Sequence, residues 1–260
     1  MSQPSNILDS FRLNGRRALI TGSSGGIGFA LARALAQAGA SVILNGRNPQ
    51  KLESAVSTLR DEGLNAMSCA FDVTDANAVK LAVDSLEADG HEVHILVNNA
   101  GIQIRNPINE FAEQDWQALM RTNLDSVFYV GKAVAQKMIE RRSGKIINIC
   151  SVQSELGRPS IAPYAASKGA VKMLTKGMAI DLGPHGINVN GLGPGYFKTE
   201  LTEKLVADPA FTQWLTSRTP SRRWGEVHEL GGAVVFLASD ASQFVNGHIL
   251  YVDGGVTATL

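Results

Sequence analysis

The chain has 260 residues, of which 44% are hydrophobic and 18% are charged, a composition typical of a globular protein with a large buried core. Twenty-four basic residues balance 24 acidic ones, and no basic stripe with interleaved aromatic residues is present, which argues against a nucleic-acid partner. Residues 1–10 lack the pattern of a signal peptide, and no uncharged apolar run reaches membrane length. We therefore expect a cytoplasmic protein with no membrane partner.

The cysteines and histidines give little sign of metal or disulfide chemistry. Cys69 and Cys150 lie in apolar, strand-like runs, and we interpret them as small core residues rather than a disulfide pair, which favours a reducing compartment. The five histidines show no metal-ligand spacing, so we expect no metal site.

Short apolar runs alternate with helical patterns along the chain. Strand patterns cover residues 18–21, 42–45, 66–71, 94–97, 145–150, 187–190 and 248–252. Helical patterns cover residues 27–38, 49–62, 76–88, about 115–141 with a break or junction near Asn123, 164–182 and 227–238. This alternation predicts βαβ units and a parallel sheet in one α/β domain that spans residues 1–260. Residues 196–223 are polar without a strand signal, and we expect them to form a lid over a cleft.

A glycine-rich turn, Thr21-Gly-Ser-Ser-Gly-Gly-Ile-Gly28, joins the first strand to the first helix. Gly22 permits the tight turn, Gly26 lets the backbone approach a pyrophosphate, and Gly28 allows close helix–strand packing. The helix N-terminus adds N–H donors and a positive dipole end. The spacing differs from G-x-G-x-x-G, and a glycine turn without a ligand is the alternative. The strand before it and the helix after it favour a bound dinucleotide.

The end of the second strand indicates which dinucleotide is bound. An acidic residue there would bond the ribose 2′-hydroxyl, but the chain has Gly46 and Arg47, and a guanidinium suits a 2′-phosphate. We therefore expect a preference for NADP(H), with NAD(H) bound at lower affinity. The alternative is that Arg47 is an ordinary solvated loop charge. Asp72 and Val73 end the third strand, where they can frame an adenine ring, although Asp72 can equally cap a turn.

Ser151, Tyr164 and Lys168 form the candidate catalytic set. Tyr164 and Lys168 are four residues apart on a predicted helix, so both can face one cleft, and Ser151 follows a buried-strand pattern. A nearby ammonium favours the phenolate, so we expect Lys168 to lower the pKa of Tyr164. Ser151 would then bond the oxygen that Tyr164 protonates or deprotonates. The alternative for the pair is a surface helix with an incidental Tyr and Lys.

Taken together, these motifs resemble the classical short-chain dehydrogenase/reductase family. The resemblance rests on residues 21–28, 98–101, Asn123, Ser151, Tyr164-x-x-x-Lys168 and Pro194-Gly195, which follow the family order across nearly the whole chain. It implies a Rossmann-type, doubly wound sheet of seven parallel strands in the order 3-2-1-4-5-6-7, with helices on both faces, and usually a homotetramer. It also implies that Asn123 completes a proton relay with Lys168 and Tyr164.

The resemblance and the glycine loop together give a full set of predicted cofactor contacts. These are Gly22, Ser23, Ser24, Gly26, Ile27, Gly28, Arg47, Asp72, Val73, Asn99, Gly101, Tyr164, Lys168, Gly195, Phe197 and Thr199. For Asn99, a plain turn-forming role is the alternative.

Residues 148–158, 195–200, 218–225 and 244–248 are similar to family members that act on sugar acids. Such a substrate needs a cation for its carboxylate and polar donors for its hydroxyls. Arg105 and Arg158 each follow the end of a strand, and Gln153 lies near Ser151, so we predict that these three bind substrate with Ser151 and Tyr164. The alternative for each arginine is a solvated charge or an ion pair with a carboxylate such as Glu155. Two other functions stay open: a reductase of another polyol, keto sugar or 3-oxoacyl substrate, and a non-enzymatic NADP-binding sensor.

Overall fold

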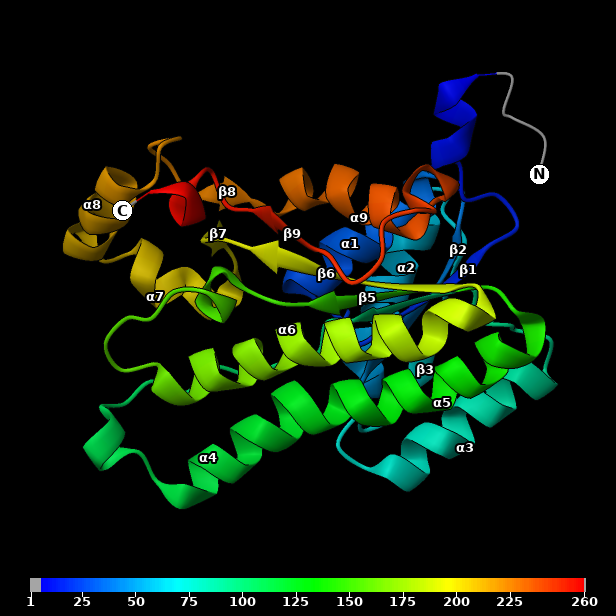
Figure 1. The fold of residues 1–260 in the computed structure, drawn as a ribbon, viewed down its shortest axis with the longest axis horizontal. Helices are drawn as coiled ribbons and strands as arrows, with labels where there is room; N and C mark the ends of the chain where they lie inside the picture. Colours follow the sequence, from blue (N-terminus) through cyan, green and yellow to red (C-terminus); the bar gives the residue numbers. More distant parts are fainter. Residues whose placement is uncertain (1–5, 260) are drawn as a thin grey trace.

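The computed structural model describes residues 6–259, which build a seven-stranded parallel sheet in the order β3-β2-β1-β4-β5-β6-β9 (Figure 1). Its strands are β1 (Arg17–Ile20), β2 (Ser41–Gly46), β3 (Ala66–Ala70), β4 (Ile95–Asn98), β5 (Gly144–Ile149), β6 (Ile187–Pro194) and β9 (Ile249–Val252). Because β9 is the seventh strand of this sheet in chain order, the predicted Rossmann-type order is confirmed.

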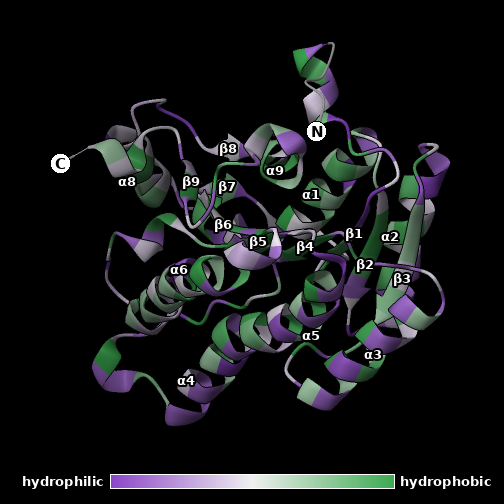
Figure 2. Cartoon of the chain, turned by 45° about the vertical axis from the view of Figure 1, so that its right-hand side comes forward, coloured by the Kyte–Doolittle hydropathy of each residue, from purple (hydrophilic) through white to green (hydrophobic). Residues whose placement is uncertain are grey.

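Helices cover both faces of the sheet (Figure 1). One face carries α1 (Gly26–Gln37), α2 (Pro49–Asp61) and α9 (Gly231–Ala238), whose buried side chains share one core cluster. The other carries α3 (Ala76–Ala88), α5 (Ser126–Arg141) and α6 (Ala162–Leu182), which share a second cluster. Hydrophobic and hydrophilic residues alternate along α2, α3 and α5, as Figure 2 shows, so each of these helices turns an apolar stripe toward the sheet.

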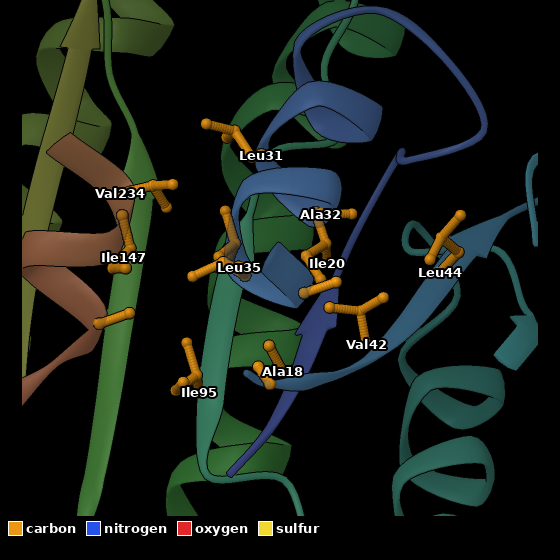
Figure 3. Packing of buried hydrophobic residues seen from close by; sticks show 14 of the residues in the cluster. Ala18, Ile20, Leu31, Ala32, Leu35, Val42, Leu44, Ile95, Ile147 and Val234 are labelled. Atoms are coloured by element: carbon orange, nitrogen blue, oxygen red, sulfur yellow. The ribbon is translucent and has the colours of Figure 1, made fainter. Parts of the chain in front are cut away.

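The packing of α1 against the sheet shows how the apolar pattern holds the glycine loop in place. Leu31 and Leu35 lie one turn apart on the inner face of α1 and are fully buried, as is Ile20 at the end of β1 (Figure 3). Burying a leucine side chain of this kind stabilises the fold by about 1.5–3 kcal/mol. The N-terminus of α1 is therefore fixed directly beyond the end of β1.

The helical pattern near Asn123 is joined rather than broken. α4 (Glu113–Met120) runs into a π-helical turn (Arg121–Asp125) and on into α5 without leaving the helical conformation. Asn123 lies in this turn and is fully buried. Wide turns of this kind often occur at functional sites because they change the direction of one side chain.

The segment predicted as a lid contains more regular structure than its sequence indicates. It holds α7 (Glu203–Val206) and α8 (Pro209–Arg218), and strand β7 (Phe197–Lys198) pairs in parallel with β8 (Gly225–Glu226). Strands of two residues are too short to show a periodic pattern, which is why none was predicted. Downstream, the predicted 227–238 helix starts as a 3₁₀ turn (Val227–Leu230) before α9.

Within residues 6–259, no helix combines the length and the apolar character needed to cross a bilayer. The same residues contain no group of three or more His, Cys, Asp or Glu side chains placed to hold a metal ion.

Candidate active site

A cleft of about 790 Å³ opens at the carboxyl ends of the parallel strands. Loops that follow β1 to β6 line it, and so do residues 199–202 and Leu205 from the predicted lid. Every predicted cofactor, substrate and catalytic residue lines this cleft except Ser23 and Asn123. The sheet therefore brings together groups that are up to 177 positions apart in sequence, from Gly22 to Thr199.

The glycine loop has the geometry of a phosphate site. Gly22 and Gly26 have φ angles of +61° and +56°, a region that suits glycine. A Cβ on Gly28 would lie 2.4 Å from the carbonyl oxygen of Gly22, so only glycine fits there. The space beside Gly26 is open, and the backbone N–H groups of Gly26 and Ile27 have no acceptor among the described residues. These donors, at the N-terminus of α1, fit a pyrophosphate.

Two polar side chains around this loop make hydrogen bonds within the protein. Ser23 is fully buried, where its Oγ donates to the Ile20 carbonyl at 2.7 Å and accepts from the Asn45 N–H at 3.0 Å. Asn99 Nδ2 donates to the carbonyls of Thr21 and Gly22, each at 2.9 Å. Ser23 therefore ties β1 to β2, and Asn99 ties the loop after β4 to the glycine loop, although Asn99 also lines the cleft.

Thr21 is a residue that the motif reading did not single out. Its Oγ1 accepts from the backbone N–H groups of both Asn99 and Ala100, each at 3.0 Å. It therefore sets the spacing between the two loops that flank the front of the cleft. Its position directly before Gly22, at the end of a strand, was the signal that pointed to it.

Arg47 extends into solvent at the rim of the cleft, with 75% of its side chain exposed. Its guanidinium lies 4.0 Å from the Asp72 carboxylate. Asp72 also accepts two 2.8 Å hydrogen bonds from Thr74, so it does cap a turn. Burial tends to raise the pKa of Asp72, but these bonds and the charge of Arg47 outweigh it and leave the pKa below its usual value. An exposed guanidinium whose one ion-pair contact among the described residues is 4.0 Å long suits a phosphate ligand.

Ser151, Tyr164 and Lys168 converge at the middle of the cleft. Pro163 lies in the first turn of α6. Tyr164 and Lys168 follow it on one face of the helix, with Lys168 Nζ 5.8 Å from the centroid of the Tyr164 ring. Lys168 Nζ donates to the Ile149 carbonyl at 2.7 Å, which anchors α6 to the end of β5. Ser151 lies two residues beyond the end of that strand and lines the cleft close enough to Tyr164 to lower the pKa of its phenol.

The electrostatics of this set differ from the expectation in one respect. Burial raises the pKa of Tyr164 above its ordinary value, while the hydrogen bond with Ser151 and the charge of Arg105 act in the opposite direction. The expected lowering by Lys168 is not found, because burial lowers the pKa of Lys168 itself to about 8 and its ammonium points to the Ile149 carbonyl. At neutral pH the phenol is therefore a proton donor and the amine is mostly charged.

Asn123 lies behind the cleft wall rather than in it. Its Oδ1 accepts from the Ile102 N–H at 2.7 Å, and its Nδ2 donates to the Ile102 carbonyl at 3.0 Å and to Ser167 Oγ at 3.3 Å. Ser167 in turn donates to the Tyr164 carbonyl. Asn123 thus connects the loop after β4 to the first turns of α6.

Arg105 and Arg158 both line the cleft, and neither has a carboxylate within 4.0 Å among the described residues. Burial and the neighbouring charge of Arg158 lower the pKa of Arg105, which shows that the two guanidiniums feel each other. Glu155 does not pair with Arg158, because it bonds Lys172 and Tyr251 instead. The ion-pair alternative with Glu155 is therefore excluded.

The remaining polar contacts run from Ser151 to the predicted lid. Ser151 Oγ donates to Gln153 Oε1 at 3.1 Å, and Gln153 Nε2 donates to Tyr196 Oη at 3.2 Å. Tyr196 was not among the predicted residues. Its position directly after Pro194-Gly195, at the end of β6, was the available signal.

Comparisons with known proteins agree with this geometry. The family model described as enoyl-(acyl carrier protein) reductase, within the short-chain dehydrogenase group, matches residues 22–257. The chain is 60% identical to gluconate 5-dehydrogenase of Gluconobacter oxydans (strain 621H) over 260 residues, 100% of both proteins. It is 54% identical to 5-keto-D-gluconate 5-reductase of Escherichia coli (strain K12) over 248 residues, 95% of this chain and 98% of that protein.

Among solved structures, the chain is similar to a gluconate 5-dehydrogenase from Burkholderia cenocepacia J2315 in complex with NADP and tartrate. The TM-score is 0.96 at 59% identity, covering 98% of this chain and 100% of that one. The family model covers most of the chain, and the relatives are similar to it over their full length. The chain belongs to the short-chain dehydrogenase/reductase family.

Proposed function

We propose that this protein is an NADP(H)-dependent oxidoreductase that interconverts D-gluconate and 5-keto-D-gluconate. The observation that carries the proposal is that one cleft holds the phosphate-type glycine loop, the Ser151–Tyr164 pair and two arginines that have no carboxylate partner among residues 6–259. A ketone reductase needs the first two, and a sugar-acid substrate needs a cation. The names of the full-length relatives and the NADP complex of the B. cenocepacia enzyme support the same function.

The chain's own residues divide the chemistry between them. NADPH, when bound, supplies the hydride, and the glycine loop and Arg47 hold its phosphates. Ser151 bonds the C5 carbonyl oxygen, and Tyr164, neutral at pH 7, gives its proton to that oxygen. In the oxidation direction the phenolate of Tyr164 takes the proton from the C5 hydroxyl. Lys168, whose Nζ donates to the Ile149 carbonyl, would also bond the nicotinamide ribose when the cofactor is bound. Asn123 holds the loop at Ile102 and would complete the proton relay with Lys168 and Tyr164.

The two arginines account for the acid end of the substrate. Arg105 and Arg158 bind the carboxylate at the mouth of the cleft, and Gln153 bonds a hydroxyl next to the reacting carbon. The amide of Gln153 lies between Ser151 and Tyr196, so it is placed near the oxygen that reacts. In this arrangement residues 196–223 act as a lid on a single domain of residues 1–260, since their first turns already line the cleft.

We also propose a homotetramer in the cytoplasm that binds no nucleic acid. Large apolar side chains stand exposed on α4, α5 and α6, namely Trp116 (42% exposed), Phe128 (48%), Met173 (61%) and Ile180 (76%). A run of exposed apolar groups on neighbouring helices is typical of a subunit interface. Both cysteines are free thiols, which suits a reducing compartment.

A substrate panel tests the function directly. With NADPH, we expect 5-keto-D-gluconate to be reduced with a kcat/KM at least about 100-fold above that of fructose, which lacks the carboxylate that the arginines bind. Oxidation of NADPH at 340 nm is the measurement, with 2-ketogluconate and a 3-oxoacyl thioester alongside. Faster turnover of the thioester or of a neutral ketose would identify a different reductase. Tight NADPH binding without any turnover would identify a sensor.

Replacing Tyr164 by Phe removes the proton donor and keeps the ring. We expect kcat to fall by about 10²–10⁴-fold, because the variant loses the general acid that protonates the carbonyl oxygen. The NADPH dissociation constant, measured by fluorescence titration, should change by less than about threefold. Near-normal turnover in this variant would refute the role of the phenol.

Replacing Arg47 by Ala tests the cofactor preference. The lost charge-assisted contact to the 2′-phosphate should weaken NADPH about 10–100-fold and leave NADH within about twofold. Arg12→Ala, which removes an exposed arginine outside the cleft, is the matched control. Equal losses for NADPH and NADH would show that Arg47 does not contact the phosphate.

The pKa of Lys168 predicts a pH limit on reduction. Burial lowers this pKa to about 8, so the free enzyme loses the ammonium charge as the pH rises through 8, well before an exposed lysine would. Tyr164, with its raised pKa, stays protonated there. We therefore expect kcat/KM for NADPH to be level from pH 6 to about 7.5 and to fall tenfold per unit above about 8.5. In Lys168→Arg, whose charge persists, this decline should be absent, and a flat wild-type profile to pH 9.5 would contradict the assignment.

A further inference from the structure

Tyr196 joins the substrate half of the cleft to the segment that contains β7, α8 and β8. It follows Gly195 at the end of β6, and its carbonyl accepts from the Gly225 N–H at 2.9 Å, next to the β7–β8 pair. Its hydroxyl oxygen accepts two hydrogen bonds, from Gln153 Nε2 at 3.2 Å and from Arg158 Nε at 3.1 Å. One phenol thus contacts both of the groups assigned to the polar part of the substrate.

The first of these contacts holds the Gln153 amide between two hydroxyl groups. Gln153 Oε1 accepts from Ser151 Oγ, and its Nε2 donates to Tyr196 Oη. Because a hydroxyl can donate or accept, both ends of the amide are satisfied at this position. Tyr196 therefore keeps the amide of Gln153 next to Ser151.

The second contact fixes the Arg158 guanidinium. Its Nε is used by Tyr196, and its plane lies over the Phe211 ring, with 5.4 Å between the guanidinium carbon and the ring centroid. One terminal nitrogen donates weakly to the Pro159 carbonyl at 3.4 Å. Within the described part of the chain, the guanidinium is thus oriented without a carboxylate partner and keeps terminal N–H groups for an anion.

The ring of Tyr196 is held as firmly as its hydroxyl. It packs edge-on against Trp224, with 5.8 Å between centroids, and is tilted against Phe211 at the same distance. Trp224 Nε1 also donates to Thr212 Oγ1 on α8. The ring therefore belongs to an aromatic cluster between α8 and β8, and the position of this cluster sets where the hydroxyl stands.

We propose that Tyr196 is the positioning residue for sugar-acid recognition. Its hydroxyl holds Gln153 where the amide bonds a substrate hydroxyl next to the reacting carbon, and it holds Arg158 where the guanidinium bonds the substrate carboxylate. This inference rests on the proposed function, since it names the same substrate. It assigns no proton transfer to Tyr196. The phenol acts through its two neighbours, and its effect is therefore on substrate binding and not on the cofactor.

Tyr196→Phe tests this because phenylalanine keeps the ring contacts with Phe211 and Trp224 and removes only the hydroxyl. We expect the KM for 5-keto-D-gluconate to rise about tenfold, kcat to stay within about twofold and the NADPH dissociation constant to be unchanged. Tyr129→Phe, the same change on α5 outside the cleft, is the matched control and should alter none of the three.

A double variant separates positioning from a general structural role. If Tyr196 acts through Arg158, then Tyr196→Phe with Arg158→Ala should have nearly the KM of Arg158→Ala alone, whereas independent effects would multiply. Multiplying effects, an unchanged KM in Tyr196→Phe, or equal losses of kcat and of NADPH binding would each overturn the proposal.

The proposed function and the positioning role of Tyr196 can be refuted independently of each other. Absence of 5-keto-D-gluconate reduction by the wild type would refute it, and Tyr196 is then judged by calorimetric binding of D-gluconate to the NADP⁺-loaded protein. Binding about tenfold weaker in Tyr196→Phe than in wild type and Tyr129→Phe supports the positioning role. Equal binding by wild type and Tyr196→Phe, or no binding by wild type, overturns it.

Discussion

The site depends on how α6 is fixed against the end of β5. Lys168 Nζ donates to the Ile149 carbonyl, and Ser154 Oγ donates to the Lys168 carbonyl at 2.9 Å, so two bonds join the helix to the strand end and to the turn after it. Because β5 is buried along its whole length, that strand end cannot shift without disturbing the core. Ser151 and Tyr164 consequently meet although they come from different elements.

Burying Lys168 and Tyr164 at this anchor point shifts the pKa of both side chains toward their neutral forms. A buried lysine bonded to a carbonyl, with no carboxylate within 4.0 Å among the described residues, is held in its charged form less firmly than one in water. The phenol beside it is likewise kept neutral by burial. The protein therefore holds a proton on Tyr164 at neutral pH, which suits ketone reduction. The phenolate that the oxidation direction requires needs further positive charge or hydrogen bonding at that oxygen.

Much of this arrangement could be predicted from the sequence, because it depends on local patterns. The alternation of strands and helices predicted the parallel sheet, and the family resemblance implied its strand order. The loop of residues 21–28 and the Tyr164–Lys168 spacing predicted the cleft. What could not be predicted depends on contacts across the fold. Nothing near Ser23 in sequence shows that its hydroxyl bonds β2. Nor does the segment around Tyr196 show that aromatic packing with residues 15 to 28 positions later carries its hydroxyl to Gln153.

The proposed function requires Tyr164 to face the reacting carbon of a sugar acid whose carboxylate lies on the two arginines. A crystal structure of the ternary complex with NADP⁺ and D-gluconate measures this directly. We expect Tyr164 Oη within hydrogen-bond distance of the C5 oxygen, about 2.6–3.2 Å, with C5 about 3–3.5 Å from C4 of the nicotinamide and the carboxylate on Arg105 or Arg158. A gluconate bound the other way round, or a Tyr164 hydroxyl directed away from C4, would contradict it.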